Sequence, residues 1–252
     1  LARTDIIDVS VLGSLNQLQR LELTRVRVSD ISKLGRLSHL KTLFLGRTQI
    51  SDISALRGLI ELRTLALHGA PVSDISVLEN LSGLTNLYLD ETQVSDIAAL
   101  GSLTQLQTLE LRGTRVSDIS VLRNLSQLKS LDLGRTDVAD VSALRSLSKL
   151  QTLDLLETPV SDISAFAELS GLKNLFLNGA KVTDISALRG LSQLRVLSLD
   201  DTLVSDISAV AELSQLRTLE LNRTQVSDIS FLRHVSLLRT LELSDTKVSG
   251  TS

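Results

Sequence analysis

Hydrophobic residues recur along this chain with an unbroken period of 22 residues. Counted from Leu15, the unit reads L-x-x-L-x-x-L-x-L-x-x-T-x-V-S-D-I-S-x-L-x-x, and residues 103–124 (LTQLQTLELRGTRVSDISVLRN) match it throughout. Leucines at positions 7 and 9 alternate with variable residues at positions 6, 8 and 10, which is typical of a short half-buried strand. Because every unit contributes one strand in the same chain direction, the repeat predicts a parallel sheet.

The predicted fold class is an α/β repeat, a leucine-rich-repeat solenoid. We expect a curved right-handed coil with one short parallel β-strand per 22-residue unit on the concave face and 3₁₀ or irregular segments on the convex face. A single domain is expected over residues 1–252, with a partial unit at 1–14 and eleven units starting at 15, 37, 59, 81, 103, 125, 147, 169, 191, 213 and 235, the last truncated. Leu1 falls in the middle of a strand, and Gly250 replaces the repeated aspartate shortly before Ser252, so we expect a fragment of a longer protein.

Two polar positions of the unit are expected to stabilise its turns. Position 12 is threonine in eight of the eleven units, and a buried hydroxyl there can satisfy backbone groups. The Ser-Asp-Ile-Ser stretch that follows begins a short helical turn whose amides can donate to the aspartate. We therefore assign a structural role to the aspartates that recur with the repeat: Asp8, Asp30, Asp52, Asp74, Asp96, Asp118, Asp140, Asp162, Asp184, Asp206 and Asp228.

Composition and charge narrow the possible functions. The formal net charge of −3 provides no basic excess for binding nucleic acid, and no apolar run is long enough for membrane insertion. The chain has no cysteine, which excludes disulfides and thiolate metal sites. His39, His68 and His234 occupy positions 3, 10 and 22 of their units, which face different sides of a coil, so we expect neither a catalytic triad nor a histidine metal site. We therefore predict no enzyme activity, no cofactor and no bound metal.

Function is expected on the variable side of the strands, above all at position 8. Three of the five aromatic residues, Phe44, Tyr88 and Phe176, fall in this column, and exposed aromatic rings commonly anchor interfaces. Phe44 and Tyr88 flank the unit that contains Ala66 and His68. We expect these four residues to form one patch.

A second apolar cluster is expected from three successive units, at Leu156, Phe176 and Val196, with Leu203 at its rim. The predicted partner-binding residues of the whole chain are Phe44, His68, Tyr88, Glu110, Arg112, Asp132, Asp154, Leu156, Phe176 and Val196.

Glu110, Asp132 and Asp154 occupy position 8 of adjacent units between the two clusters. Like charges in neighbouring strands cost stability unless something compensates them. A basic ligand would do so, and so would internal pairing with Arg112, Arg135 or the basic residues of position 5, and the sequence leaves both open. Those position 5 residues are Lys41, Arg63, Lys129, Lys173, Arg195, Arg217 and Arg239.

The unit with its D-I-x-x-L ending resembles the leucine-rich repeats of the bacterial internalins over essentially the whole chain. Internalins have asparagine where this chain has threonine, so the resemblance implies a buried threonine ladder in place of the asparagine ladder. It also implies a surface or secreted protein that grips a receptor on its concave side. The repeats of this chain also resemble the sensor regions of bacterial intracellular signalling proteins, in which the repeats recognise a ligand and a separate domain responds.

The leading hypothesis is a non-catalytic module that binds a protein or peptide partner, of unknown identity, on its concave face. The alternatives are a structural spacer or engineered, consensus-like scaffold without a selected ligand, and the ligand-sensing region of a larger bacterial signalling protein. Location stays open between the bacterial surface or exterior and the cytoplasm. Uncapped ends also predict possible end-to-end self-association.

Overall fold

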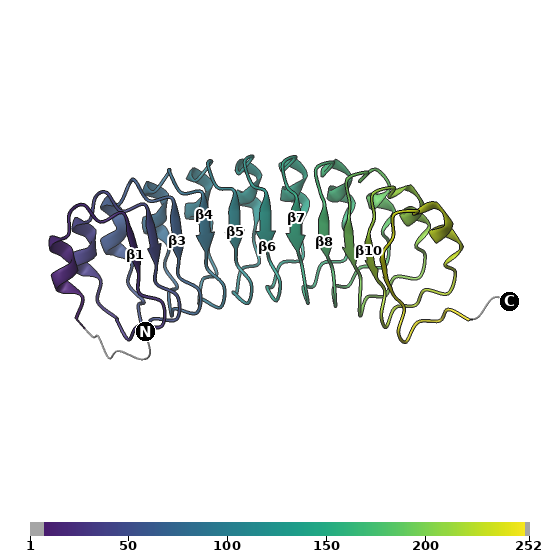
Figure 1. Ribbon diagram of the computed structural model, residues 1–252, viewed down its shortest axis with the longest axis horizontal. Coiled ribbons are helices and arrows are strands. Elements are labelled where there is room, and N and C mark those ends of the chain that lie inside the picture. Colours follow the sequence, from purple (N-terminus) through teal and green to yellow (C-terminus); the bar gives the residue numbers. More distant parts are fainter. Residues whose placement is uncertain (1–7, 250–252) are drawn as a thin grey trace. The chain divides into compact units, whose positions relative to one another are not determined.

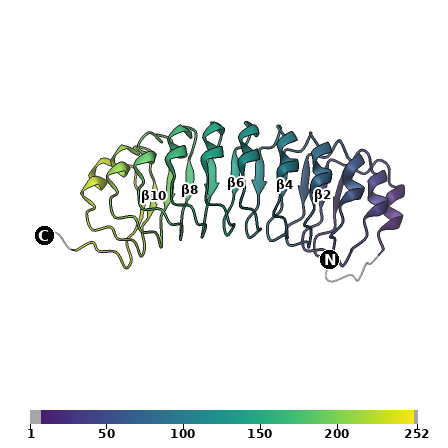
Figure 2. The ribbon, with the colours of Figure 1, turned by 180° about the vertical axis from the view of Figure 1, so that it is seen from behind.

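The computed structural model describes residues 8–249, so the expectations about Leu1, Gly250 and Ser252 concern positions outside the described residues. Contacts between residues divide the chain into two compact units, Leu1–Leu128 and Lys129–Ser252. From here on, these are called the first unit and the second unit, and each 22-residue repeat within them is called a coil. Within each unit a row of short strands and a row of short helical turns run along the stacked coils (Figure 1), and Figure 2 shows the same rows from behind. The predicted leucine-rich-repeat solenoid is confirmed.

The first unit contains five parallel strands among its described residues. Each strand pairs with the next, and the paired residues are one repeat apart, as in Leu43↔Leu65. The strands are β1 (Arg20–Glu22), β2 (Thr42–Phe44), β3 (Thr64–Ala66), β4 (Asn86–Tyr88) and β5 (Thr108–Glu110). The 3₁₀ turns are η1 (Ser10–Ser14), η2 (Ser32–Arg36), η3 (Ser54–Gly58), η4 (Ser76–Asn80), η5 (Ala98–Ser102) and η6 (Ser120–Asn124).

The second unit repeats this arrangement with six described strands, again parallel and paired one repeat apart. The strands are β6 (Ser130–Asp132), β7 (Thr152–Asp154), β8 (Asn174–Phe176), β9 (Val196–Ser198), β10 (Thr218–Glu220) and β11 (Thr240–Glu242). The 3₁₀ turns are η7 (Ser142–Ser146), η8 (Ser164–Glu168), η9 (Ser186–Leu188), η10 (Ser208–Glu212) and η11 (Ser230–His234).

The core of each coil is built from the repeated aliphatic positions. In the coil that starts at residue 103, the leucines of positions 7 and 9, Leu109 and Leu111, are completely buried. Leu103, Leu106 and Leu122 of the same coil are completely buried as well. Phe166 takes the place of the position 20 leucine in its own coil and is also completely buried. The leucines of each coil are covered by the neighbouring coils, so a single coil could not bury them alone.

The two polar columns stabilise the turns as predicted. Each of the eight position 12 threonines donates its hydroxyl to the carbonyl oxygen three residues earlier, and Thr92 does so to Leu89 over 2.6 Å. These bonds lie within one coil, so the threonine ladder is a stack of separate turn bonds. Each repeated aspartate accepts the amide two residues later, as Asp52 does from Ser54 at 2.8 Å.

Position 11 adopts a left-handed backbone in every described coil. Three coils place glycine there, at Gly69, Gly113 and Gly179. The other eight place a charged residue there with φ between 52° and 64°. An L side chain in this region crowds the backbone, so these turns carry strain that glycine avoids. The non-glycine residues are Arg25, Arg47, Glu91, Arg135, Glu157, Asp201, Arg223 and Asp245.

Candidate interaction surface

The outward side chains of positions 6, 8 and 10 form what we call the strand face of each unit. In the first unit, Phe44, Ala66 and Tyr88 are paired in register on β2, β3 and β4, and we call these three residues the aromatic strip. Ala66 points outward but is only 2% exposed, and its register partners on the two neighbouring strands are Phe44 and Tyr88. Phe44 and Tyr88 themselves are half-buried. Three of the four residues of the predicted patch thus occupy register positions on adjacent strands.

The β1 end of the aromatic strip carries a paired charge. The guanidinium carbon of Arg20 lies 4.8 Å from the centre of the Phe44 ring, which is a cation–π contact. Arg20 also forms an ion pair of 3.2 Å with Glu22, the register neighbour of Phe44. Phe44 thus has a charged neighbour on the β1 side and Ala66 on the β3 side.

The β5 end of the aromatic strip is acidic. Burial raises the pKa of the Asp90 carboxyl, while its hydrogen bonds with the Glu110 carboxyl and the Arg112 amide act in the opposite direction. Burial also raises the pKa of the Tyr88 hydroxyl, and the charges of Glu110 and Asp90 add to that effect. His68 is electrostatically coupled to Asp90. The predicted residues His68, Tyr88 and Glu110 are thus brought together around an acid, Asp90, that the sequence analysis did not select.

The predicted apolar cluster of the second unit is more dispersed. Leu156, Phe176 and Val196 are all half-buried on the strand face. The register partners of Phe176 are Asp154 and Ser198, so Leu156 and Val196 are its diagonal neighbours. Leu203 is 60% exposed at the edge.

Two acids of position 8 accept hydrogen bonds from the backbone of their own coil. Asp132 accepts the amide of Gly134 and Asp154 accepts the amide of Leu156, both over 2.8 Å. Each carboxylate thus receives a hydrogen bond from its own coil, a form of compensation that the sequence analysis did not consider. Glu110 belongs to the first unit and the other two acids to the second.

Of the arginines considered for internal pairing, Arg135 forms two hydrogen bonds with Glu157 one coil later, at 2.9 and 3.2 Å. Both residues occupy position 11. The predicted residue Arg112 lies at position 10, where its backbone amide donates to Asp90 over 3.0 Å.

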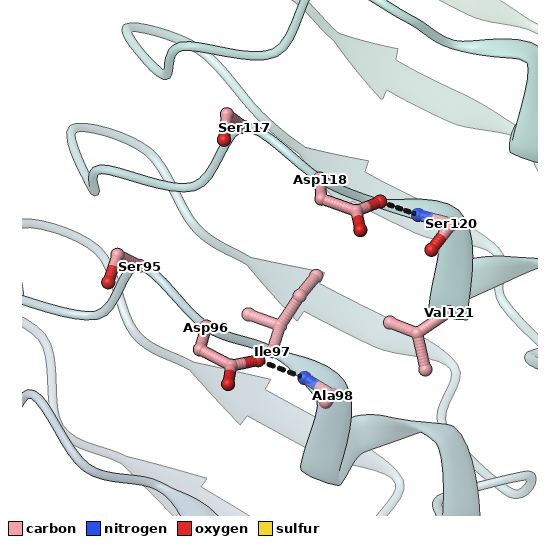
Figure 3. Close-up of a pocket in the computed structure, with 8 residues that line it drawn as sticks. All are labelled: Ser95, Asp96, Ile97, Ala98, Ser117, Asp118, Ser120 and Val121. Atoms are coloured by element: carbon pink, nitrogen blue, oxygen red, sulfur yellow. Dashed lines mark hydrogen bonds between the residues drawn. The ribbon is translucent and has the colours of Figure 1, made fainter.

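The turn side of the coils offers shallow hollows without reactive chemistry. One hollow of about 270 Å³ lies between two successive coils and is lined by Ser95, Asp96, Ile97, Ala98, Ser117, Asp118, Ser120 and Val121 (Figure 3). The two aspartates in it point along the backbone and accept the amides of Ala98 and Ser120. A hollow of about 340 Å³ recurs in the second unit around Asp162 and Asp184. We interpret these hollows as a consequence of coil stacking, because they recur with the repeat.

Residues 8–249 contain no group of three or more metal-ligating side chains placed to hold an ion. In the same part of the chain, no helix has the length and apolar character needed to span a membrane.

Sequence reasoning missed Arg20 and Asp90 as neighbours of the aromatic strip. Both lie at repeat positions, 6 and 10, whose side chains share the strand face with position 8. A comparison of these three columns across adjacent coils would have placed both residues beside the rings. The position of Gly69, Gly113 and Gly179 in one column was likewise a usable signal for the left-handed turn.

Comparison with solved structures assigns the family. An internalin of Listeria monocytogenes is 35% identical, covers 96% of this chain and 72% of its own, and superimposes with a TM-score of 0.94. This chain belongs to the internalin family. Its position 12 threonines distinguish this internalin-family chain from the asparagine pattern stated above.

Two further solved structures share the fold of this internalin-family chain. A leucine-rich-repeat protein of Leptospira interrogans is 24% identical with a TM-score of 0.91, and the match covers 96% of this chain and 64% of that protein. The plant peptide hormone receptor RGFR1 in complex with RGF2 is 19% identical with a TM-score of 0.74, and the match covers 95% of this chain and 46% of the receptor. No family sequence model matches the chain, and no curated protein matches its sequence.

Proposed function

We propose that this internalin-family chain is a non-catalytic module that binds a protein or peptide partner on its strand face. The observation that carries the proposal is the aromatic strip of the first unit. Phe44 and Tyr88 are half-buried on either side of the buried Ala66, and their remaining surface lies on the strand face of β2 and β4. Aromatic side chains in this arrangement offer a large contact area at low entropic cost, as at many protein interfaces.

The order within the aromatic strip supports the same function. The strands of the strip are paired in register, and Arg20 lies over the ring of Phe44. A surface that is ordered before binding loses less conformational entropy when a partner docks. The half-buried residues Leu156, Phe176 and Val196 give the second unit a further apolar area on its strand face.

Relatives with the same architecture add support. The fold-level match to a plant receptor in complex with RGF2 provides an example of a leucine-rich-repeat protein with a bound ligand. Two of the three histidines have partners other than serine: His39 contacts Glu61, and His234 contacts Arg233.

The proposal is tested by affinity capture with two variants of equal size. The test variant changes Phe44, Tyr88 and Phe176 to alanine, and the control variant changes the exposed apolar residues Val11, Ile60 and Leu237 to alanine. Circular dichroism first establishes that both are folded. The expected result is a protein retained by the parent and the control, which binds again in purified form and is lost from the test variant. Equal retention by all three chains would contradict the proposal and favour a spacer, or a ligand-sensing region with its site elsewhere.

A further inference from the structure

The second unit carries a column of basic side chains along one border of its strand face. Arg195, Arg217 and Arg239 occupy position 5 of three consecutive coils, and we call them the arginine column. Their backbones are directly linked, because the amide of Arg217 donates to the carbonyl of Arg195 and the amide of Arg239 to that of Arg217, each over 2.8 Å. Adjacent strands lie about 4.8 Å apart, so the three side chains start within about 10 Å of one another.

The guanidinium groups of the arginine column are not used by the fold. Within residues 8–249, none of the three forms a side-chain hydrogen bond or an ion pair. Other basic residues of the same position do find acceptors: Lys173 donates to the Gln151 side chain over 3.0 Å, and Arg63 donates to a backbone carbonyl over 2.9 Å. Three like charges in adjacent strands repel one another. The fold keeps this repulsion without an internal counter-charge.

The surroundings of the arginine column favour a partner that places carboxylates over the arginines but not over the neighbouring glutamates. The neighbouring position 6 residues, Val196, Thr218 and Thr240, carry no charge. Glu220 and Glu242 lie three residues further along their strands, about 10 Å away, and accept hydrogen bonds from Ser198 and Asn222. A uniformly anionic polymer spread over this face would meet those two glutamates. A protein segment can place acids over the arginines and neutral or basic groups over the glutamates.

We propose that the arginine column binds a protein segment that presents a row of carboxylates. Guanidinium groups suit this role because their planar donors match carboxylate oxygens in pairs. The inference rests on the proposed function for the class of partner, a protein. It adds the chemical character of the segment and a second place of contact, separate from the aromatic strip.

The test is an NMR titration with a defined probe, an acetylated twelve-residue peptide of alternating glutamate and serine, at low ionic strength. The parent is compared with a triple variant, Arg195→Gln, Arg217→Gln and Arg239→Gln. The matched control, Arg36→Gln, Arg57→Gln and Arg145→Gln, removes the same charge from exposed 3₁₀ turns. Exposed ion pairs are individually weak, so we expect the test variant to lose about tenfold in affinity, or about 1.4 kcal/mol, and the control less than about twofold.

Three outcomes would overturn the inference. Equal losses in both triple variants would mean a general attraction between charges, and no loss in either would mean that the column is not a site. Tighter binding of a sulfated heparin oligosaccharide than of the peptide, through the same arginines, would mean a sulfated polymer as ligand. The aromatic triple variant separates this inference from the proposed function. A captured partner that needs Phe44, Tyr88 and Phe176 but not the arginine column would support the proposed function and contradict the inference about the arginine column.

Discussion

The threonine column gives the sharpest prediction about stability, and Thr92→Val is the perturbation that isolates it. Thr92 is 5% exposed, and its hydroxyl donates to the Leu89 carbonyl over 2.6 Å. Valine has nearly the same shape, so the change removes the hydroxyl while opening little empty space. The Leu89 carbonyl also accepts the Thr92 amide at 3.2 Å and is not left without a donor. The loss is therefore that of one net hydrogen bond, about 1 kcal/mol, and not the larger penalty of an orphaned buried group.

The assay is urea unfolding followed by circular dichroism, with Thr104→Val as the control. Thr104 is exposed and has no such bond to a carbonyl three residues earlier, so its change should stay within about 0.5 kcal/mol. For a chain of this length, 1 kcal/mol corresponds to a shift of about 2–4 °C in Tm. Thr48 lies two coils away, and Thr48→Val combined with Thr92→Val should cost about 2 kcal/mol. A Thr92→Val chain as stable as the parent would refute the view that the threonine hydroxyls stabilise the turns.

Three further predictions concern the turns and the core. Gly113 has a φ of +68°, and a Cβ added there would meet no atom of another coil nearer than 3.8 Å. Gly113→Ala should therefore destabilise the chain by about 1 kcal/mol through backbone strain alone. Gly190→Ala, at a position without that backbone strain, is the control in the same urea unfolding assay. The hydrogen bond from the backbone amide of Ser54 lowers the pKa of Asp52 below its ordinary 3.8. The Asp52 carboxylate therefore stabilises the folded chain above pH 3.8, and this contribution disappears as the pH falls through the lowered pKa. The urea midpoints at pH 7 and pH 3 should differ less in Asp52→Asn than in the parent, and an unchanged difference would contradict this role. Phe166 is completely buried, so Phe166→Ala should cost about 3–5 kcal/mol in the same assay, and a loss below about 1 kcal/mol would show that the site collapses around the change.

The repeat made most of the fold predictable, because each regular position has the same environment in every coil. Leu109 and Leu111 had to face a core, and the short segment around Ser120 could form only a 3₁₀ turn or an irregular one. The roles of the repeated aspartates and threonines followed from the donors and acceptors available at a turn. These features depend on local chemistry and on stacking, both of which a periodic sequence states directly.

The irregular positions were harder to predict, because their contacts depend on which side chains happen to lie one coil apart. The sequence placed Phe44 and Tyr88 on one surface, but the burial of Ala66 between them required the register. Asp132 accepts a hydrogen bond from the backbone amide of Gly134, a local contact that the repeat pattern alone does not specify. The left-handed turn at position 11 was obscured by the eight charged residues that tolerate it.

The most direct test of the central claim, that the strand face binds a protein partner, is photo-crosslinking from its centre. A benzophenone amino acid replaces Tyr88 in one chain and Ser76, on the 3₁₀ turn η4, in a second. The partner captured by the parent should become crosslinked from position 88 and not from position 76. Crosslinking from position 76 alone would place the partner on the turn side and contradict the account.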